Sequence, residues 1–245
     1  MRLDQAMVER RLVQSRARAR DAVLRGHVSI NGQRAKKASA GTWEGDDIVL
    51  DDPASQYVSR AALKLKYGLE QFGFSPKGHD CMDVGASTGG FTQVLLEQGA
   101  NRVFAFDVGH GQMKERVASH PAVVNREGLN AKTITADDLP FPFSFIVSDV
   151  SFISLQTALP ACLALAQPGA TCLFLVKPQF EVGKGNLGKG GIVSDPELAL
   201  ASAVNIAHWL ANDYGSTVQG PIKSPISGGG GNQEFLVGAI LGDTK

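Results

Sequence analysis

Asp83-Val-Gly-Ala-Ser-Thr-Gly-Gly-Phe91 is the part of this sequence that decides its fold. An apolar run at 81–84 leads into it and predicts a strand, and the pattern at 90–97 predicts a helix after it. Gly85 and Gly89 allow a tight turn and let a ligand approach the backbone closely. A strand, a glycine-rich turn and a helix in this order predict the start of an α/β domain that binds a nucleoside cofactor. A glycine turn with a purely structural role is the alternative.

Acidic residues near this turn favour a cationic cofactor over a nucleotide phosphate. Asp107 ends the next apolar run, 24 residues after Asp83, where a carboxylate can accept hydrogen bonds from both hydroxyls of a ribose. The Gly-Lys-Ser/Thr ending of a phosphate loop is missing, Ser87 replaces the second glycine of the dinucleotide fingerprint, and Asp83 would repel a pyrophosphate. We therefore expect S-adenosylmethionine, which has an amino acid tail, a ribose and an adenine but no phosphate. The residues expected to bind it are Asp83, Gly85, Ser87, Thr88, Gly89, Gly90, Phe91, Asp107 and Asp149.

From residue 58 onward, helical and strand-like patterns alternate. This alternation predicts an α/β domain with a largely parallel seven-stranded sheet and helices on both faces. The strands are expected at 81–84, 102–106, 122–125, 143–149, 171–177, 217–222 and 234–241, and the helices at 60–72, 90–97, 154–166 and 196–212. Two glycine-rich stretches, 178–195 and 228–231, are interpreted as loops beside a site, with plain connectors as the alternative.

The first sixty residues predict a separate, small α+β domain. Apolar residues at helical spacing indicate a helix at 3–12, and Ser15 is placed to cap a second helix that ends before Gly26. Strands are expected at 28–30 and 48–50, with a tight turn at Asn31-Gly32. We expect domains at 1–52 and 59–245, joined by a linker at 53–58.

The charges are divided unevenly along the chain. The formal net charge is zero, yet residues 1–37 hold ten Lys or Arg against three acids, and the rest of the chain holds 14 bases against 21 acids. This asymmetry predicts that the N-terminal segment binds a polyanion. A merely solvated basic face is the alternative.

No membrane or redox signature stands out. Cys81, Cys162 and Cys172 lie in apolar runs without metal-ligand or disulfide spacing, which predicts buried thiols in a reducing compartment. Residues 150–176 carry no charge, but Pro160 and Gly169 interrupt them, so a helix, a turn and a buried strand are favoured over a membrane span. The first residues lack an apolar signal-peptide core, so we expect a cytoplasmic protein.

Four charged residues stand where ligands bind in open α/β sheets, beyond the carboxyl ends of the strands. Lys64 lies in the helix before the first strand, Asp149 and Lys177 end two strands, and Glu234 begins the last. A ribose 2'-hydroxyl is a weak nucleophile, and a neutral lysine can take its proton. Burial beside the charge of Lys64 would favour a neutral Lys177, while the two acids would orient the amines and oppose that effect. Salt-bridged surface charges are the alternative.

At these motifs the chain resembles the TlyA family, which joins an RNA-binding domain of the type in a small-subunit ribosomal protein to an FtsJ-like methyltransferase domain. The motifs that carry the resemblance span nearly the whole chain and include Val58-Ser-Arg…Lys64-Leu, Gly85-Ala-Ser-Thr-Gly-Gly-Phe-Thr, Asp107-Val-Gly-His-Gly-Gln, Ser151-Phe-Ile-Ser-Leu, Val176-Lys-Pro-Gln-Phe-Glu-Val-Gly-Lys-Gly and Gly231-Asn-Gln-Glu-Phe.

The resemblance implies a class I, Rossmann-like methyltransferase fold and S-adenosylmethionine-dependent 2'-O-methylation of cytidine in ribosomal RNA. It implies a catalytic tetrad at Lys64, Asp149, Lys177 and Glu234, with Lys177 as the base, Lys64 positioning the hydroxyl and the acids orienting the amines. It also implies that the N-terminal domain binds ribosomal RNA or a ribosomal subunit. The basic residues involved would be Arg10, Arg11, Arg16, Arg18, Arg20, Arg25, Arg34, Lys36 and Lys37.

The chain departs from the family pattern at the linker. The mycobacterial member has Arg-x-Trp-Val before the catalytic domain, and this chain has Ser55-Gln-Tyr-Val58, which puts a linker-based coupling of RNA and cofactor binding in doubt. The short N-terminal arm favours the form of the family that modifies only large-subunit RNA.

Three other functions compete with this interpretation. Members of the family are often labelled haemolysins, so a pore-forming protein is one alternative, which the lack of a membrane segment disfavours. A catalytically silent ribosome-assembly factor is another, which the four retained charged residues disfavour. A nicotinamide-dependent dehydrogenase is the third, which the glycine spacing disfavours.

Overall fold

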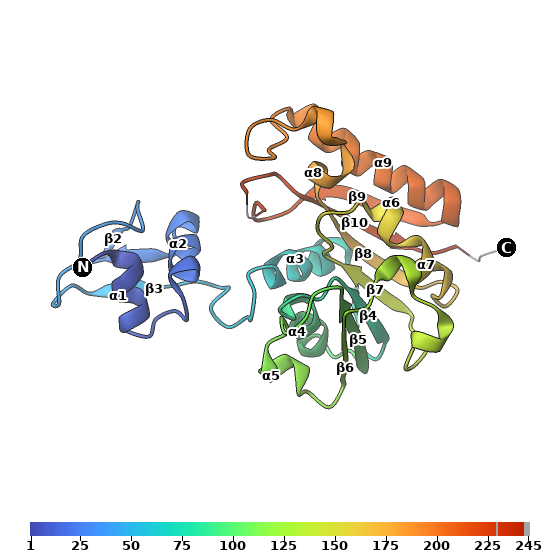
Figure 1. The fold of residues 1–245 in the computed structure, drawn as a ribbon, viewed down its shortest axis with the longest axis horizontal. Coiled ribbons are helices and arrows are strands. Elements are labelled where there is room, and N and C mark those ends of the chain that lie inside the picture. Colours follow the sequence, from blue (N-terminus) through green and yellow to red (C-terminus); the bar gives the residue numbers. More distant parts are fainter. Residues whose placement is uncertain (229, 243–245) are drawn as a thin grey trace. The chain divides into compact units, whose positions relative to one another are not determined.

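The computed structural model describes residues 1–228 and 230–242, and the chain divides into two units, Met1–Gln56 and Tyr57–Lys245 (Figure 1). The boundary between the units falls inside the linker predicted at 53–58. Residue 229 of the second glycine-rich stretch and residues 243–245 of the predicted C-terminal domain lie outside the described residues.

The N-terminal unit packs two helices against a small antiparallel sheet. The helices are α1 (Leu3–Glu9) and α2 (Arg16–Arg25), and the strands, in the order β2-β1-β3, are β2 (Gln33–Arg34), β1 (Val28–Ile30) and β3 (Ile48–Leu50). The predicted caps of α2 are confirmed, since the Ser15 hydroxyl accepts a hydrogen bond from the Arg18 amide and Gly26 ends the helix at φ +84°. α1 is shorter than the predicted 3–12 because Arg11 takes a left-handed conformation with φ +58°.

The second unit is built on a seven-stranded sheet with the order β6-β5-β4-β7-β8-β10-β9. Pairs β4–β5, β5–β6, β4–β7 and β7–β8 are parallel, and only β10 pairs with its two neighbours in the antiparallel sense. The strands are β4 (Asp80–Val84), β5 (Arg102–Asp107), β6 (Val123–Glu127), β7 (Phe145–Ser148), β8 (Thr171–Val176), β9 (Thr217–Lys223) and β10 (Phe235–Ile240). The predicted largely parallel sheet is confirmed. The strand order reverses at β4, so the carboxyl ends of β4, β5 and β7 surround one crevice.

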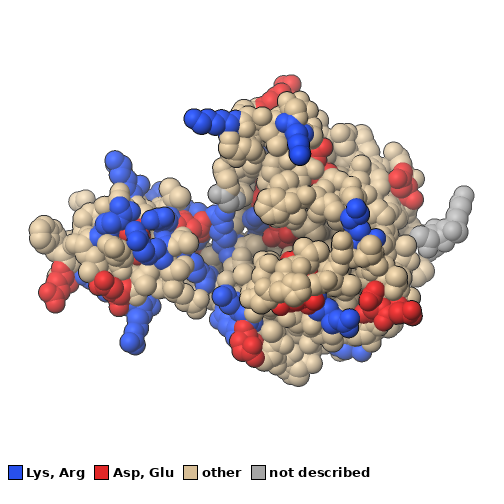
Figure 2. All heavy atoms as spheres, in the orientation of Figure 1, with Lys and Arg blue, Asp and Glu red and all other residues tan. Residues whose placement is uncertain are grey.

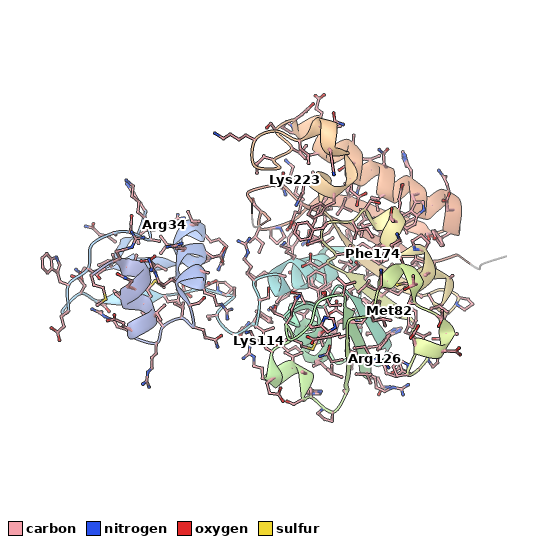
Figure 3. The ribbon with its side chains drawn as sticks, viewed as in Figure 1. Arg34, Met82, Lys114, Arg126, Phe174 and Lys223 are labelled. Atoms are coloured by element: carbon pink, nitrogen blue, oxygen red, sulfur yellow. The ribbon has the colours of Figure 1, made fainter. Side chains whose placement is uncertain are left out.

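Helices cover both faces of this sheet, as predicted (Figure 1). Alternate side chains of a strand point to opposite faces, so Met82 of β4 and Phe174 of β8 enter one apolar core, while Cys81 and Leu173 enter the other (Figure 3). The first core is closed by α6, α7 and α9, and the second by α3 and α4. The helices are α3 (Ala62–Phe72), α4 (Gly90–Glu97), α5 (Glu115–Ala118), α6 (Leu155–Ala158), α7 (Pro160–Ala164), α8 (Pro178–Glu181) and α9 (Pro196–Tyr214), with short 3-10 turns at Ala131–Thr133, Ala136–Asp138 and Lys184–Asn186.

The uncharged segment at 150–176 folds as a helical region, a turn and a strand. The helix predicted at 154–166 is divided into α6 and α7, because Pro160 has no N–H to continue the hydrogen bonding and instead starts a new helix. β8 follows as a buried strand. Across residues 1–228 and 230–242, no helix has both the length and the apolar character that crossing a membrane requires. The three cysteines are buried and free, as expected.

Candidate active site

The turn between β4 and α4 takes the conformation that its glycines allow. Gly85 has φ +81°, and a Cβ there would lie 3.0 Å from Cγ1 of Val150, so the turn packs directly against the chain that follows β7. Ser87 is a non-glycine residue at φ +46°, a conformation that occurs mainly where the surrounding structure enforces it. A Cβ at Gly90 would lie 2.9 Å from that of Ser59, which confirms close packing at the start of α4.

Asp107 ties the glycine turn to the loop after β5. Its Oδ2 accepts a hydrogen bond from the Ser87 amide at 3.0 Å, and its Oδ1 accepts one from the Gly109 amide at 2.8 Å. The carboxylate is therefore fixed at the carboxyl end of β5, where the sequence analysis expects a ribose ligand.

A cavity of about 580 Å³ opens beside these two loops. Its size suits a small-molecule cofactor. It is lined by Val84, Gly85, Ser87, Phe106, Asp107, Val108, Gly109, Gln112, Leu129, Asn130, Ala131, Lys132, Asp149, Val150, Ser151, Phe152, Ile153 and Ala158. A smaller cavity of about 70 Å³ is lined by Thr88, Gly90 and Phe91, and Gly85, Ser87 and Asp149 line both. Seven of the nine residues predicted to bind the cofactor thus line one or both of these cavities.

The two remaining residues, Asp83 and Gly89, line neither of these cavities. Asp83 is fully buried, its Oδ2 accepts a hydrogen bond from the Thr92 hydroxyl at 2.6 Å, and its Oδ1 has no hydrogen-bond partner. Burial, with smaller contributions from the negative charges of Asp149 and Asp107, raises the pKa of Asp83 to about 7. The two carboxylates that line the larger cavity, Asp107 and Asp149, therefore disfavour ionisation of the buried Asp83.

Lys177 follows β8 and reaches across to the end of β7. Its Nζ lies 2.7 Å from Oδ1 of Asp149 and donates to the Ser151 hydroxyl at 2.7 Å and to the Asp149 carbonyl at 3.4 Å. Lys177 and Asp149 are only partly exposed, and Lys177 contacts two residues that line the larger cavity, Asp149 and Ser151. The amine is thus held by two neighbouring residues of the loop after β7.

Lys64 and Glu234 form a second ion pair, which is almost completely buried. Lys64 comes from α3, and Glu234 immediately precedes β10. Phe235 lies opposite Val176 in the antiparallel pair of β10 and β8, so the backbone of Glu234 lies beside that of Lys177. The structure therefore brings the four predicted residues together as two adjacent ion pairs.

The glycine-rich stretches support this arrangement. A Cβ at Gly228 would lie 2.5 Å from Oε1 of Glu234, so a side chain there would displace the Glu234 carboxylate. Asn232 joins the two stretches, because its Oδ1 accepts a hydrogen bond from the Val193 amide at 2.9 Å and its Nδ2 donates to the Gly191 carbonyl at 3.0 Å. Both stretches lie beside the candidate site, and they are hydrogen-bonded to each other.

Sequence reasoning missed two residues at the cavity rim, Ser151 and Phe152. Ser151 holds Lys177, as described above. Phe152 is 92% exposed at φ +67°, and its ring centroid lies 5.3 Å from that of Phe180. A large apolar side chain in a left-handed conformation and in water is unfavourable on both counts, which indicates a functional role. Both residues belong to the family motif Ser151-Phe-Ile-Ser-Leu. However, a serine or a phenylalanine in a loop does not by itself indicate a functional role.

The basic residues of the N-terminal unit differ in their surroundings, although Figure 2 shows Lys and Arg gathered over this unit. Arg10 donates to the backbone carbonyls of Trp43 and Glu44, both at 2.9 Å, and thereby braces a loop. Arg25 is paired with Asp21 and Asp52 and is only 12% exposed. In this structure these two arginines have intramolecular partners, so a role in RNA binding for them stays a prediction.

The other predicted RNA-binding residues are more accessible. Arg11, Arg34, Lys36 and Lys37 are exposed, and Arg18 is half-buried and donates to the Ala54 carbonyl at 3.1 Å. Arg16 and Arg20 share the carboxylate of Asp4 with Arg2, which sequence reasoning did not include. The basic side chains of Arg2, Arg16 and Arg20 therefore converge, although Arg2 precedes α1 and the other two lie at the start of α2.

Comparisons with known proteins match both units. Residues 57–240 match the family described as FtsJ-like methyltransferase, and residues 1–42 match the S4 domain. A Mycobacterium tuberculosis protein named 16S/23S rRNA (cytidine-2'-O)-methyltransferase TlyA is 41% identical over 96% of this chain and 88% of its own length. A Campylobacter jejuni protein named 23S rRNA (cytidine-2'-O)-methyltransferase TlyA is 34% identical over 96% of this chain and 98% of its own length.

Solved structures show the same architecture. One from Streptococcus thermophilus, described as a candidate hemolysin, is 36% identical, with a TM-score of 0.77 over 100% of this chain and 89% of that chain. The matches to the methyltransferase family and to the S4 domain favour a methyltransferase over the dehydrogenase considered from the glycine spacing.

Proposed function

The chain belongs to the TlyA family, in which an S4 domain precedes an FtsJ-like methyltransferase domain, and from this premise we propose that it methylates the 2'-hydroxyl of a cytidine in ribosomal RNA. The observation that carries the proposal is the position of Lys177. Its amine is held by Asp149 and Ser151 at the rim of the cavity that is lined by the predicted cofactor residues.

S-adenosylmethionine as the methyl donor is part of this proposal, and the residues present fit it. The unpartnered Oδ1 of Asp83 and the carboxylates of Asp107 and Asp149 make the site electronegative. A ligand with a positive sulfonium and a positive amino group relieves that charge, whereas a phosphate would add to it. Apolar side chains of Val108, Leu129 and Ile153 offer a wall for an adenine ring. When bound, the cofactor supplies an electrophilic methyl group.

Lys177 then acts on the hydroxyl that receives the methyl group. A neutral amine has two N–H groups and one lone pair. The Ser151 hydroxyl at 2.7 Å and the Asp149 carbonyl at 3.4 Å accept N–H groups of Nζ and restrict the direction of the lone pair, while Asp149 Oδ1 lies 2.7 Å from Nζ as an ion-pair partner. The 2'-hydroxyl that receives the methyl group would give its proton to Nζ of Lys177, while the S–CH3 bond of the cofactor would break with its electron pair left on sulfur. The resulting ammonium is stabilised by the Asp149 carboxylate.

Lys64 and Glu234 support this step by positioning the groups that take part in it. Their ion pair is buried and therefore rigid, and Glu234 lies beside Lys177 in the sheet. We assign them the positioning of the hydroxyl and of the Lys177 backbone. Removing either partner alone would leave a buried charge unpaired, so both single variants are expected to lose stability as well as activity.

Large-subunit RNA is the proposed target. The relative named for 23S rRNA alone is covered over 98% of its length, and the relative named for both 16S and 23S rRNA over 88%. Both relatives are named for 23S rRNA, which supports the large subunit as the target.

The test is transfer of a radiolabelled methyl group from S-adenosylmethionine to unmodified small and large ribosomal subunits. We expect label in large-subunit RNA, and with Lys177→Arg a loss of about 10²- to 10⁴-fold in rate, because arginine keeps the charge but does not become neutral. Lys184→Ala, an exposed lysine on the neighbouring loop, is the matched control and should keep full activity. Label in small-subunit RNA would contradict the target, and activity of Lys177→Arg would exclude Lys177 as the base.

A further inference from the structure

Asp4 is a fully buried carboxylate surrounded by three arginines. Its Oδ1 accepts from Nε of Arg2 at 3.0 Å, and its Oδ2 accepts from Nη2 of Arg16 at 3.0 Å and from Nε of Arg20 at 3.1 Å. Arg2 directly precedes α1, whereas Arg16 and Arg20 lie one turn apart at the start of α2. One carboxylate thus gathers three guanidinium groups from two separate elements.

The guanidinium groups remain accessible although they are held from the inside. The side chains of Arg2, Arg16 and Arg20 are 45%, 45% and 53% exposed, in contrast to 0% for Asp4. A guanidinium has five N–H donors, and each of the three arginines uses at most two of its donors on Asp4. The cluster carries two more positive than negative charges and has spare donors facing solvent.

A second ion-pair network in the same unit shows what a purely structural cluster looks like. Arg25 lies between Asp21 and Asp52, with 12% of its side chain exposed and 7% of that of Asp52. Arg25, Asp21 and Asp52 together carry one positive and two negative charges, a balance that does not favour an anion. Both networks can hold the unit together, but only the one around Asp4 also suits a phosphate.

We propose that Asp4 is a positioning residue that holds Arg2, Arg16 and Arg20 together as one phosphate-binding site for the backbone of the RNA substrate. The inference rests on the proposed function for the nature of the polyanion. Without Asp4, three like charges would repel one another and their long side chains would sample many rotamers, so each phosphate contact would have to order them. With Asp4, the fork-shaped groups are ordered before RNA arrives, which favours paired contacts to phosphate oxygens.

The charge of Asp4 allows a sharp test. Asp4→Asn keeps the size of the side chain but removes one negative charge, so if only net charge mattered, RNA would bind more tightly. If Asp4 positions the arginines, RNA should instead bind about tenfold more weakly, and the slope of log Kd against log salt should decrease by about one phosphate contact. Asp52→Asn makes the same charge change in the structural network and should leave RNA affinity unchanged or slightly increased.

The measurement is fluorescence anisotropy of a labelled large-subunit RNA fragment with the full-length protein at several KCl concentrations. Thermal unfolding and S-adenosylmethionine affinity, measured on the same samples, show whether each variant is folded. If Asp4→Asn is unfolded, Arg20→Lys tests the inference instead, because lysine keeps the positive charge but lacks the forked guanidinium group. Weaker RNA binding by Arg20→Lys supports the positioning role of Asp4, and RNA binding equal to that of the wild type overturns it.

Wild-type-like or tighter binding by folded Asp4→Asn also overturns the inference. RNA binding is measured separately from methyl transfer. If the wild-type protein binds RNA but transfers no methyl group, the proposed function is refuted, and the RNA affinities of the variants still test the role of Asp4.

Discussion

At the scale of single residues, Phe152 combines two unfavourable features at the mouth of the larger cavity. Its ring is 92% exposed and its backbone has φ +67°, directly after Ser151, which holds Lys177. Strain of this kind persists where a neighbouring function requires it. The position suits an aromatic platform against which a nucleobase stacks while its ribose lies near Lys177.

For Phe152→Ala we expect an increase in KM for RNA of about tenfold, because base stacking on an aromatic ring contributes about 1 to 3 kcal/mol. S-adenosylmethionine affinity should change little. Phe152→Tyr keeps the ring and serves as the control that should retain the wild-type KM. Steady-state kinetics with RNA as the varied substrate provide the measurement, and an unchanged KM for Phe152→Ala would exclude stacking.

Asp83 makes the stability of the cofactor-free protein depend on pH. Burial raises its pKa to about 7, so between about pH 4 and pH 7 the folded state holds a proton that the unfolded state has lost. The unfolded state binds fewer protons in this window, so the free energy of unfolding decreases as the pH rises.

We therefore expect wild type to lose about 1 to 4 kcal/mol relative to Asp83→Asn between pH 5 and pH 8. Asparagine stays neutral at both pH values and can still accept the hydrogen bond from Thr92, so the comparison isolates the charge. Urea unfolding of both proteins without cofactor gives the difference. A constant difference across this pH range would show that Asp83 stays ionised in the folded state.

Positions at strand ends, and in the helix before β4, were enough to predict that Lys64, Asp149, Lys177 and Glu234 lie together, because the sheet order places β7, β8 and β10 side by side. Their catalytic roles stay a prediction. These positions were not enough to predict how the four pair, since pairing depends on side-chain reach. Ser151 and Asp4 were missed for a different reason. Asp4 matters because it is buried among arginines, and Ser151 matters because it contacts Lys177, which is distant in sequence. Neither burial nor a distant contact is visible in a local sequence pattern.

At the scale of elements, Asn232 connects two glycine-rich stretches that the sequence could describe only as loops. It is buried, and its side-chain amide forms hydrogen bonds with the backbones of Val193 and Gly191 in the other stretch. Glycine-rich segments can adopt many backbone conformations. The hydrogen bonds of Asn232 restrict the conformations of the stretch before β10, and this restriction keeps Glu234 paired with Lys64.

Asn232→Ala should lower the methylation rate several-fold more than it lowers S-adenosylmethionine affinity, because two hydrogen bonds of about 1 kcal/mol each are lost outside the cofactor cavity. Hydrogen exchange should report the cause directly, since the Val193 amide would lose its acceptor and exchange faster. Asn186→Ala, in the same region but bonded only to the Val182 carbonyl among the described contacts, is the control. Unchanged Val193 exchange would contradict this connection.

Most elements follow closely from periodicity, although β2, α5 and α8 were not predicted, and one departure is instructive. The helix expected at 154–166 is two helices because Pro160 ends the first and begins the second. The pattern of apolar residues continues through the break, since both helices bury their apolar side against the same core. Apolar periodicity therefore predicts burial here better than it predicts backbone continuity.

At the scale of the whole molecule, the basic segment at 1–37 lies within the N-terminal unit, whose residues 38–56 add five acids and no base. The N-terminal unit has its own small core around Leu3, Met7 and Val23, and the second unit has two cores on its sheet. Each unit therefore has the means to fold independently, with the basic one binding the polyanion and the other carrying the chemistry.

A fragment comprising residues 57–245 should keep S-adenosylmethionine affinity and lose at least about 10² in RNA affinity, since it lacks the basic residues of the N-terminal unit. Calorimetry with the cofactor and anisotropy with RNA measure the two affinities. The full-length chain at the same salt concentration is the reference. RNA affinity equal to that of the full chain would place the main RNA contacts in the second unit.

The insertion of β10 between β8 and β9 has a consequence for when activity begins. Lys64 must wait for Glu234, which the ribosome adds 170 residues later, and the strand behind Glu234 must enter the sheet between two strands that already exist. Folding during synthesis proceeds from the N-terminus, so the RNA-binding unit can form early while the tetrad stays incomplete. Under the proposed function, a growing chain therefore holds its RNA-binding unit before its complete active site, and methylation begins only after translation has passed β10.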